Sequence, residues 1–191
     1  PIERAKSLLP QFLKPRFFKY ADARNGLRQM LVGFIKKVVV ADNLSEYSNY
    51  IFDNYNSLPA NILFLGCVCF VFQVYADFSG YSDIAIGTAK LFGINLSTNF
   101  KTPFFSQNLA EFWRRWHISL GRFFKLYIYM PLRKKRNNKF PNWLALLITF
   151  VLIGLWHGAS WSFVVWGFIN GVLVLPLFTP KASENEYSLK A

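Results

Sequence analysis

The sequence predicts an all-α, multi-span transmembrane protein with amphipathic helices at the membrane interface. Two long segments, Asn54–Ala76 and Trp143–Phe178, contain no Asp, Glu, Lys or Arg. Between them, Lys101–Lys139 carries ten Lys and Arg residues and one acid, Glu111. The chain is also 19% aromatic and has a net charge of +12. Apolar stretches of membrane length that alternate with cationic stretches are typical of helices that cross a bilayer and connections that meet its headgroups.

Composition excludes several other protein classes. A hydrophobic content of 53% is too high for a disordered chain. Cys67 and Cys69 are the two cysteines, which excludes a disulfide framework, and their apolar surroundings predict inert thiols. A soluble all-α core remains an alternative, although soluble proteins rarely contain uncharged runs this long.

The N-terminal third is basic and only partly apolar. Nine Lys and Arg residues lie between Arg4 and Lys37. Met30–Ala41 is apolar but interrupted by Lys36 and Lys37, which favours an amphipathic or partly buried helix over a lipid-exposed span. The chain starts at Pro1 and its first 28 residues are mixed and charged, so we expect no signal peptide and an internal piece of a longer protein.

The two uncharged runs differ in length. A bilayer core about 30 Å thick needs about 20 apolar residues as helix, so the 23 residues of Asn54–Ala76 fit one span. The 36 residues of Trp143–Phe178 would extend about 54 Å as one helix. This run must therefore break, tilt or turn back, and Gly154 and Gly158–Ser160 are the break signals.

Polar residues follow the first span directly. Carboxylates so near a span are costly unless paired or hydrated, which makes them candidates for substrate binding. The alternative is a polar connection at the membrane surface, in which one carboxylate pairs with a basic residue. Nearby Gly80 and Gly87 loosen the helix or allow another helix to approach closely. The candidate side chains are Asp77, Ser79, Tyr81 and Asp83.

Glu111–Tyr127 is predicted to be one amphipathic helix at the interface. At 100° per residue, an aromatic face spans about 120° and a cationic face lies opposite it. His117 falls on the seam between the faces, where it is either functional or an interfacial histidine satisfied by water or a headgroup. The aromatic face comprises Phe112, Trp113, Trp116, Leu120, Phe123, Phe124 and Tyr127, and the cationic face Arg114, Arg115, Arg122 and Lys125.

His157 is the strongest candidate for chemistry. If the interface lies near Trp143, a helix descends about 21 Å before His157 and passes the bilayer midplane. An ionisable residue at that depth indicates a functional site, and histidine suits proton transfer near neutral pH. The alternative is a histidine hydrogen-bonded between helices.

Other kinds of site have little support. His117 and His157 lie 40 residues apart without the spacing of a zinc site, so no metal is expected. The chain has no phosphate-binding glycine loop and no nucleophile elbow. Its basic stretches alternate with membrane-length runs, which favours lipid headgroups or an anionic substrate over nucleic acid. The positive-inside rule places Arg133–Lys139 on the cytoplasmic side.

Four motifs are spaced along the chain in this order: Phe72–Gly87, Asn99–Phe104, Phe112–Leu120 and Trp156–Trp161. Together they resemble the membrane-bound O-acyltransferase family, in the branch of alginate O-acetyltransferase and its peptidoglycan and teichoic-acid relatives. The resemblance runs from about residue 10 to about 175. One departure is local: the branch usually has Arg-Asp-Tyr where this chain has Lys125-Leu-Tyr127, so Leu126 replaces an acid.

The resemblance implies a multi-pass enzyme of the inner (cytoplasmic) membrane. Such an enzyme transfers an acyl group, usually acetyl, to hydroxyls of an extracytoplasmic glycan. No cofactor would be bound, and the donor would be acetyl-CoA or an acyl carrier. Residues 1–178 would form part of the catalytic region and 179–191 a polar tail. Membrane lipids, the glycan acceptor and a periplasmic transferase would be partners.

The resemblance also assigns roles to residues. His157 matches a near-invariant intramembrane histidine and would act as general base, and His117 would orient the acceptor or assist. Arg114, Arg115 and Arg122 would hold an anionic substrate, and Trp116, Trp156 and Trp161 would line a tunnel. An alternative is a non-catalytic or truncated module that passes acyl groups to a separate transferase.

Overall fold

The computed structural model describes residues 1–134 and 141–177, which form two compact units. The first unit runs from Glu3 to Asn99 and the second begins at Phe100. Over the described residues every regular element is a helix, which confirms the all-α prediction. The polar tail 179–191 and most of the basic loop Arg133–Lys139 lie outside the described residues.

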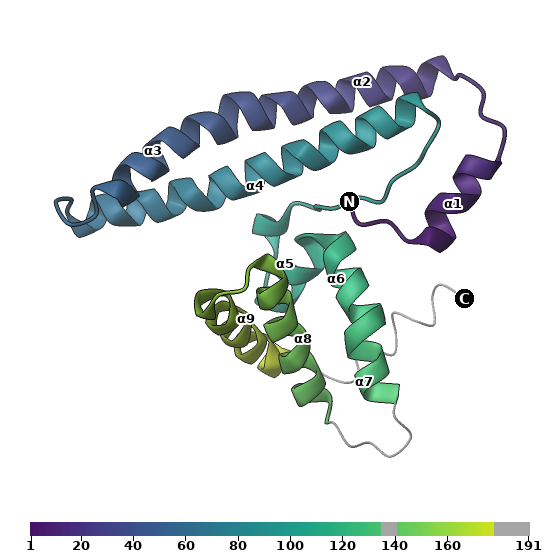
Figure 1. The fold of residues 1–191 in the computed structure, drawn as a ribbon. Helices are drawn as coiled ribbons and strands as arrows, with labels where there is room; N and C mark the ends of the chain where they lie inside the picture. The colour runs from purple at the N-terminus through teal and green to yellow at the C-terminus, as the bar shows by residue number, and fades with distance from the viewer. Residues whose placement is uncertain (135–140, 178–191) are drawn as a thin grey trace. The chain divides into compact units, whose positions relative to one another are not determined.

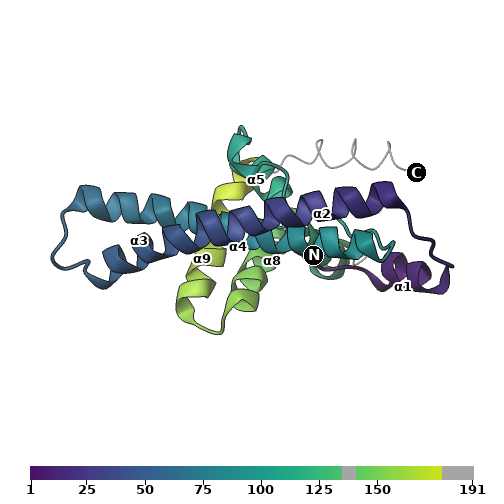
Figure 2. The same ribbon diagram turned by 90° about the horizontal axis from the view of Figure 1, so that it is seen from above.

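The first unit is built on a long antiparallel helix pair. Its first arm is one continuous helical run from Tyr20 to Asp53, which packs along α4 after the turn at Asn54–Pro59 (Figures 1 and 2). The elements are α1 (Ala5–Leu13), α2 (Tyr20–Phe34), the π-helical segment η1 (Ile35–Ala41), α3 (Asp42–Asp53) and α4 (Ala60–Leu91).

Reciprocal glycine pairs bring α2 and α4 into backbone contact. A Cβ on Gly33 would lie 2.6 Å from the carbonyl oxygen of Gly80, and one on Gly80 would lie 2.7 Å from that of Gly33. Gly26 and Gly87 meet in the same way one heptad further along. Small residues in such a stripe let two helix backbones approach closely. The predicted role of Gly80 and Gly87 in close approach is therefore confirmed.

Two ion pairs join η1 to the middle of α4. Lys36 Nζ lies 2.6 Å from Asp83 Oδ2, and Lys37 Nζ lies 2.9 Å from both Asp77 Oδ1 and Asp42 Oδ1. The π-helical turn changes the register of the helical run, so that consecutive lysines both reach α4. The predicted pairing of Asp77 or Asp83 with a base is confirmed for both.

The alternative of a polar connection after Ala76 is wrong. Instead of a polar connection after Ala76, the chain stays helical to Leu91, because the ion pairs and glycine contacts satisfy Asp77–Gly87 inside the helix pair. Asn54–Pro59 forms the turn before α4 rather than part of the span. The segment Met30–Ala41 is a partly buried helix, as predicted: its Ala41 is 1% exposed and its Val39 59%.

The second unit contains short helices and an apolar hairpin. The hairpin helices α8 and α9 turn at Gly158–Ser160 and pack side by side (Figures 1 and 2). The elements are η2 (Pro103–Phe105), α5 (Leu109–Arg115), α6 (Ile118–Phe124), η3 (Lys125–Tyr129), α7 (Met130–Lys134), α8 (Asn142–His157), α9 (Trp161–Val174) and η4 (Leu175–Leu177).

The hairpin confirms that the long uncharged run turns back at Gly158–Ser160. Gly154, the other proposed break, lies inside α8, so that part of the prediction is wrong. Gly154 instead faces the Phe163 carbonyl of α9, and Gly167 faces the Phe150 carbonyl of α8. These glycines permit a backbone-to-backbone crossing without interrupting either helix.

The single amphipathic helix predicted for Glu111–Tyr127 is also wrong. The chain breaks at Trp116–His117 into α5 and α6, and π-helical η3 begins at Lys125. The residues on either side of the break belong to different helices, so they do not form the single aromatic face and the single cationic face that the sequence predicts. The break follows from the backbone of His117, which adopts a left-handed conformation.

Within the described residues, α4 is the helix long and apolar enough to cross a membrane. It has 32 residues, and 17% of its most apolar window is buried. The helices α8 and α9 are apolar but shorter. Large apolar side chains are exposed on them, among them Trp161 at 83% and Leu173 at 55%.

Candidate active site

His117 forms the junction between α5 and α6. Its φ is 43° and its ψ 53°, a left-handed conformation that costs a residue with a Cβ about 1–2 kcal/mol. The preceding Trp116 is extended, with ψ of 130°, so the two residues turn the chain sharply. The turn buries the imidazole, which is 5% exposed. Strained backbone beneath a buried polar side chain favours a functional role over a purely structural one.

Aromatic rings connect His117 to His157. The His117 imidazole lies 6.4 Å from the Phe100 ring in a stacked arrangement and 6.0 Å from Trp156 edge-on. Trp156 in turn lies 5.0 Å from the imidazole of its neighbour His157. Trp156 therefore contacts both histidines, and the three rings form one continuous group, which we call the His–Trp–His group.

His157 is the last residue of α8, immediately before the hairpin turn. Two rings of α9 enclose it: Phe163 stacks at 6.4 Å and Trp166 meets it edge-on at 5.4 Å. Gly158 follows with φ of 173°, an extended conformation that starts the turn. The side chain is accessible within the described residues. The imidazole is thus oriented by aromatic contacts yet open to a reactant.

A second layer of aromatic rings supports the group from α5. Trp113 lies 5.7 Å from Trp166 and 5.8 Å from Phe150, both edge-on, and its indole nitrogen is buried without a hydrogen-bond partner among the described residues. Trp116 lies 5.2 Å from Phe100 and stacks on Phe112 at 5.5 Å. Edge-to-face and offset pairs of this kind stabilise a fixed arrangement by about 0.5–1.5 kcal/mol each.

Arg115 holds the segment before α5 in place. Its guanidinium lies 2.6 Å from Glu111 Oε1, and its carbonyl accepts a hydrogen bond from the Lys101 amide at 2.9 Å. The Gln107 amide, and then Arg115, hold the pKa of Glu111 below its usual value. Asn108 caps α5 by accepting from the Glu111 amide at 2.9 Å. Arg115 therefore positions Phe100 beside His117 and Trp116.

The other candidate residues are placed as follows. Arg114 and Arg122 are exposed, and among the described residues neither forms an ion pair with an acid. Trp161 is exposed at the start of α9. Asp77 and Asp83 are ion-paired in the first unit, as described above. Tyr81 is 64% exposed, and Ser79 is 2% exposed with no hydrogen-bond partner for its hydroxyl in the described part of the chain.

Burial sets the charge of His117. It lowers the pKa of the imidazole from 6.5 to about 4, with the nearby His157 as a smaller cause. His117 is therefore neutral at pH 7, and a neutral imidazole can accept a proton or a hydrogen bond.

No group of three or more His, Cys, Asp or Glu that could hold a metal occurs among the described residues.

Three contacting residues were not identified from the sequence as site residues: Phe100, Phe163 and Trp166. Phe100 lies in the Asn99–Phe104 motif, whose proximity to His117 depends on the break before α6. Phe163 and Trp166 contact His157 because the chain turns back. Residues 163 and 166 are three apart and share one face of a helix, so a hairpin prediction carried further would have placed them beside His157.

The membrane-bound O-acyltransferase family model matches residues 6–177. The peptidoglycan O-acetyltransferase of Helicobacter pylori is 40% identical over 175 residues, which cover 90% of this chain and 33% of the relative. A probable alginate O-acetylase AlgI of Azotobacter vinelandii is 39% identical over 171 residues, covering 90% and 34%. The teichoic acid D-alanyltransferase of Bacillus subtilis is 29% identical over 166 residues, covering 82% and 42%. The chain spans about a third of the length of the first two relatives.

Proposed function

The chain belongs to the membrane-bound O-acyltransferase family, and we propose that it transfers an acyl group, most simply acetyl, to hydroxyls of an extracytoplasmic cell-envelope glycan. The observation that carries this proposal is the His–Trp–His group at the tip of an apolar hairpin. The relatives supply the substrate class, since their names describe O-acetylation of peptidoglycan and alginate and D-alanylation of teichoic acid.

We propose a multi-pass arrangement in the inner membrane, in which the hairpin carries His157 into the bilayer. The 16 residues of α8 extend about 24 Å, less than the roughly 30 Å of a hydrocarbon core. With the start of α8 at one interface, its C-terminal end lies within the core. Irregular backbone at that depth is tolerated only where protein or a water-filled cavity surrounds it. A substrate passage beside the hairpin turn satisfies that condition.

His157 acts as the general base in the proposed reaction. Its imidazole takes the proton from the acceptor hydroxyl while the oxygen attacks the carbonyl carbon of a thioester donor, such as acetyl-CoA or an acyl carrier. The new C–O ester bond forms, the C–S bond breaks, and the proton passes to the departing thiolate. Positioned proton transfer of this kind contributes about 10²–10⁴-fold to a rate.

The surrounding residues bind and orient the reactants. Neutral His117 accepts a hydrogen bond from the acceptor and orients it, while Trp116, Trp156 and Trp161 line the passage. Arg114 and Arg122 are exposed cations available to an anionic donor or acceptor. Arg115 contributes through position, because its guanidinium is engaged with Glu111.

One sequence feature favours a second candidate, a module that passes acyl groups to a separate periplasmic transferase. Leu126 stands where the resembling branch usually has an acid, and it lies in η3, immediately after α6. A reconstituted assay without partner proteins separates the two candidates. Transfer to the glycan in that assay supports the enzyme, and donor turnover only upon addition of a partner supports the module.

The direct test is glycan O-acetylation in cells that produce the full-length protein with His157→Ala. We expect O-acetyl groups to fall to background while the protein remains in the membrane fraction at wild-type amount. The matched control is Asn170→Ala, at a half-buried position of α9, where the side chain donates to the Trp166 carbonyl at 2.8 Å. Undiminished acetylation with His157→Ala would overturn the assignment.

A further inference from the structure

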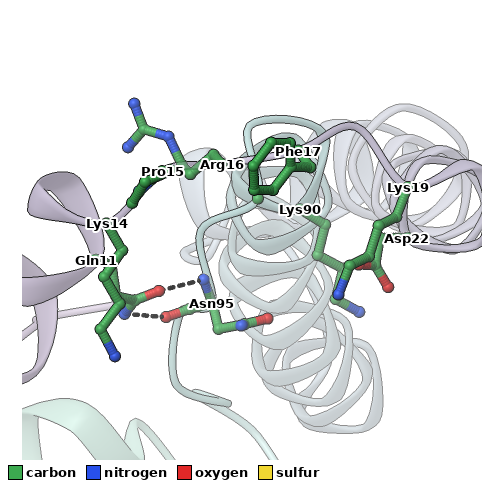
Figure 3. A pocket seen from close by; sticks show the side chains of 10 residues that line it. Gln11, Lys14, Pro15, Arg16, Phe17, Lys19, Asp22, Lys90 and Asn95 are labelled. Carbon is green, nitrogen blue, oxygen red and sulfur yellow. Dashed lines mark hydrogen bonds between the residues drawn. The ribbon is translucent and has the colours of Figure 1, made fainter.

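The first unit contains a cavity that the proposed reaction does not use. Its volume is about 530 Å³, within the range of small-ligand sites. It opens where α1 and the linker after it approach the start of α2 and the end of α4 (Figure 3). The lining residues are Gln11, Lys14, Pro15, Arg16, Phe17, Lys19, Asp22, Lys90, Gly93 and Asn95.

Positive charge dominates the lining. Four cationic side chains and one carboxylate, Asp22, give the cavity a net charge of +3. Lys14, Arg16 and Lys19 come from a single stretch of linker, and Lys90 comes from the last turn of α4. Like charges gathered around one space repel one another unless an anion neutralises them. The lining therefore favours an anionic ligand.

Hydrogen bonds tie Gln11 of α1 to Asn95, in the segment after α4, on one wall of the cavity. Gln11 Nε2 donates to the Asn95 carbonyl at 3.0 Å, and the Asn95 amide donates back to Gln11 Oε1 at 2.8 Å (Figure 3). Gly93 adopts a φ of 68°. A Cβ added to Gly93 would lie 3.7 Å from the aliphatic carbons of the Arg16 side chain. The end of α1 and the linker after it thus contact the segment after α4, and these contacts hold one wall of the cavity.

The cations keep donors available for a ligand. Lys90 Nζ gives one of its three N–H groups to Gln29 Oε1 at 2.8 Å. Among the described residues, neither Lys14 nor Lys19 forms an ion pair with an acid, and both are exposed at the mouth. The Arg16 guanidinium lies over the Phe12 ring at 5.7 Å. Two lysines and part of a third can therefore contact a ligand directly.

We propose that this cavity binds a phosphate group. Charge-assisted hydrogen bonds from lysines to phosphate oxygens are among the strong polar contacts in proteins, and phosphate offers several acceptors in a compact volume. Both an anionic phospholipid headgroup and a soluble phosphate compound present this chemistry. Acyl transfer is not required for the site, so it stands independently of the proposed function.

The charge distribution along the pair formed by α2–α3 and α4 indicates on which side of the membrane the cavity lies. Nine Lys and Arg residues lie in 4–37, whereas 38–76 contains none and has three acids. If α4 spans the bilayer, the positive-inside rule puts the cavity end at the cytoplasmic face. Anionic lipids of that leaflet and cytoplasmic phosphate compounds both have access to it there.

The test compares two probes on the full-length protein purified in neutral detergent. Native mass spectrometry measures binding of phosphatidylglycerol against phosphatidylcholine, and calorimetry measures binding of inorganic pyrophosphate. The variant Lys14→Gln/Lys19→Gln should weaken the preferred probe at least tenfold, the loss of about one charge-assisted hydrogen bond. The control Lys6→Gln/Lys101→Gln removes equal charge from exposed positions outside the cavity and should have little effect.

A third variant distinguishes binding from mere folding. Asp22→Asn removes the one carboxylate of the lining and should tighten binding severalfold, which a structural defect would not do. Weakening confined to phosphatidylglycerol assigns a lipid headgroup, and weakening confined to pyrophosphate assigns a soluble ligand. Equal weakening by the cavity and control variants, or no binding of either probe, would overturn the proposal.

Discussion

Replacing Gly33 with Ala places a methyl group directly against the backbone of α4. The added Cβ would lie 2.6 Å from the Gly80 carbonyl oxygen and 2.9 Å from the Ile84 amide nitrogen. Ordinary contact requires about 3.5 Å, so the helices must separate by nearly 1 Å. Neither backbone atom can rotate away, and overpacking of this kind costs about 1–3 kcal/mol. Alanine regains part of that, about 0.5–1 kcal/mol, through its higher helix propensity.

The balance is a net destabilisation of about 0–2.5 kcal/mol, centred near 1 kcal/mol, which thermal unfolding in detergent measures. For a chain of this size each kcal/mol shifts Tm by about 2–4 °C. The matched control is Gly121→Ala in α6, where an added Cβ meets nothing within 4 Å, and this change should leave Tm unchanged or raise it. A Gly33→Ala protein that melts with or above the control would refute the claim that backbone contact sets the α2–α4 crossing.

Three further predictions concern charge and position. Burial lowers the pKa of His117 from 6.5 to about 4, so the stability that its neutral form contributes is complete above pH 6.5 and is lost as the pH falls to 4. Over this pH range the free energy of unfolding of the wild type should fall by about 3 kcal/mol more than that of His117→Asn. Equal pH profiles of the two proteins would contradict this. Lys36→Met removes the ammonium group that lies 2.6 Å from Asp83 and should lower Tm. The double variant Lys36→Met/Asp83→Asn should recover part of that loss. A double variant with a Tm no higher than that of Lys36→Met would argue against the ion pair. Arg115→Gln should lower both Tm and activity because it removes the guanidinium contacts to Glu111 and to the Thr102 carbonyl, which hold the segment before α5. Arg122→Gln should raise KM without changing Tm, and identical effects of the two changes would show that neither role is right.

The sequence predicts the parts of the fold that depend on local composition. Helices, the apolar runs and the turn at Gly158–Ser160 follow from residue types and spacing, as does the pairing of the α4 carboxylates. The end of α4 could not be predicted this way. Asp77 and Asp83 are compatible with a helix interior only because Lys36 and Lys37 lie 40 or more residues earlier on a neighbouring helix.

The candidate site, too, is predictable from the sequence only in part. The two histidines are identifiable from the chain: His157 is an isolated ionisable group in an apolar run, and His117 lies on the seam between an aromatic and a cationic face. Their connection through Trp156 is not, since it requires the left-handed turn at His117. A helical-wheel projection assumes continuous helix, and nothing in Trp116–His117 marks a break. Tertiary packing of the aromatic rings offsets the local strain.

The central claim is that His157 serves as the base for acyl transfer. Single-turnover transfer from a thioester donor to the glycan acceptor, by full-length protein in proteoliposomes, tests it most directly. His157→Gln keeps the polar side chain but cannot accept the proton, and the account predicts a rate lower by at least 10²-fold with unchanged donor binding. A His157→Gln protein that transfers the acyl group at the wild-type rate would contradict the account.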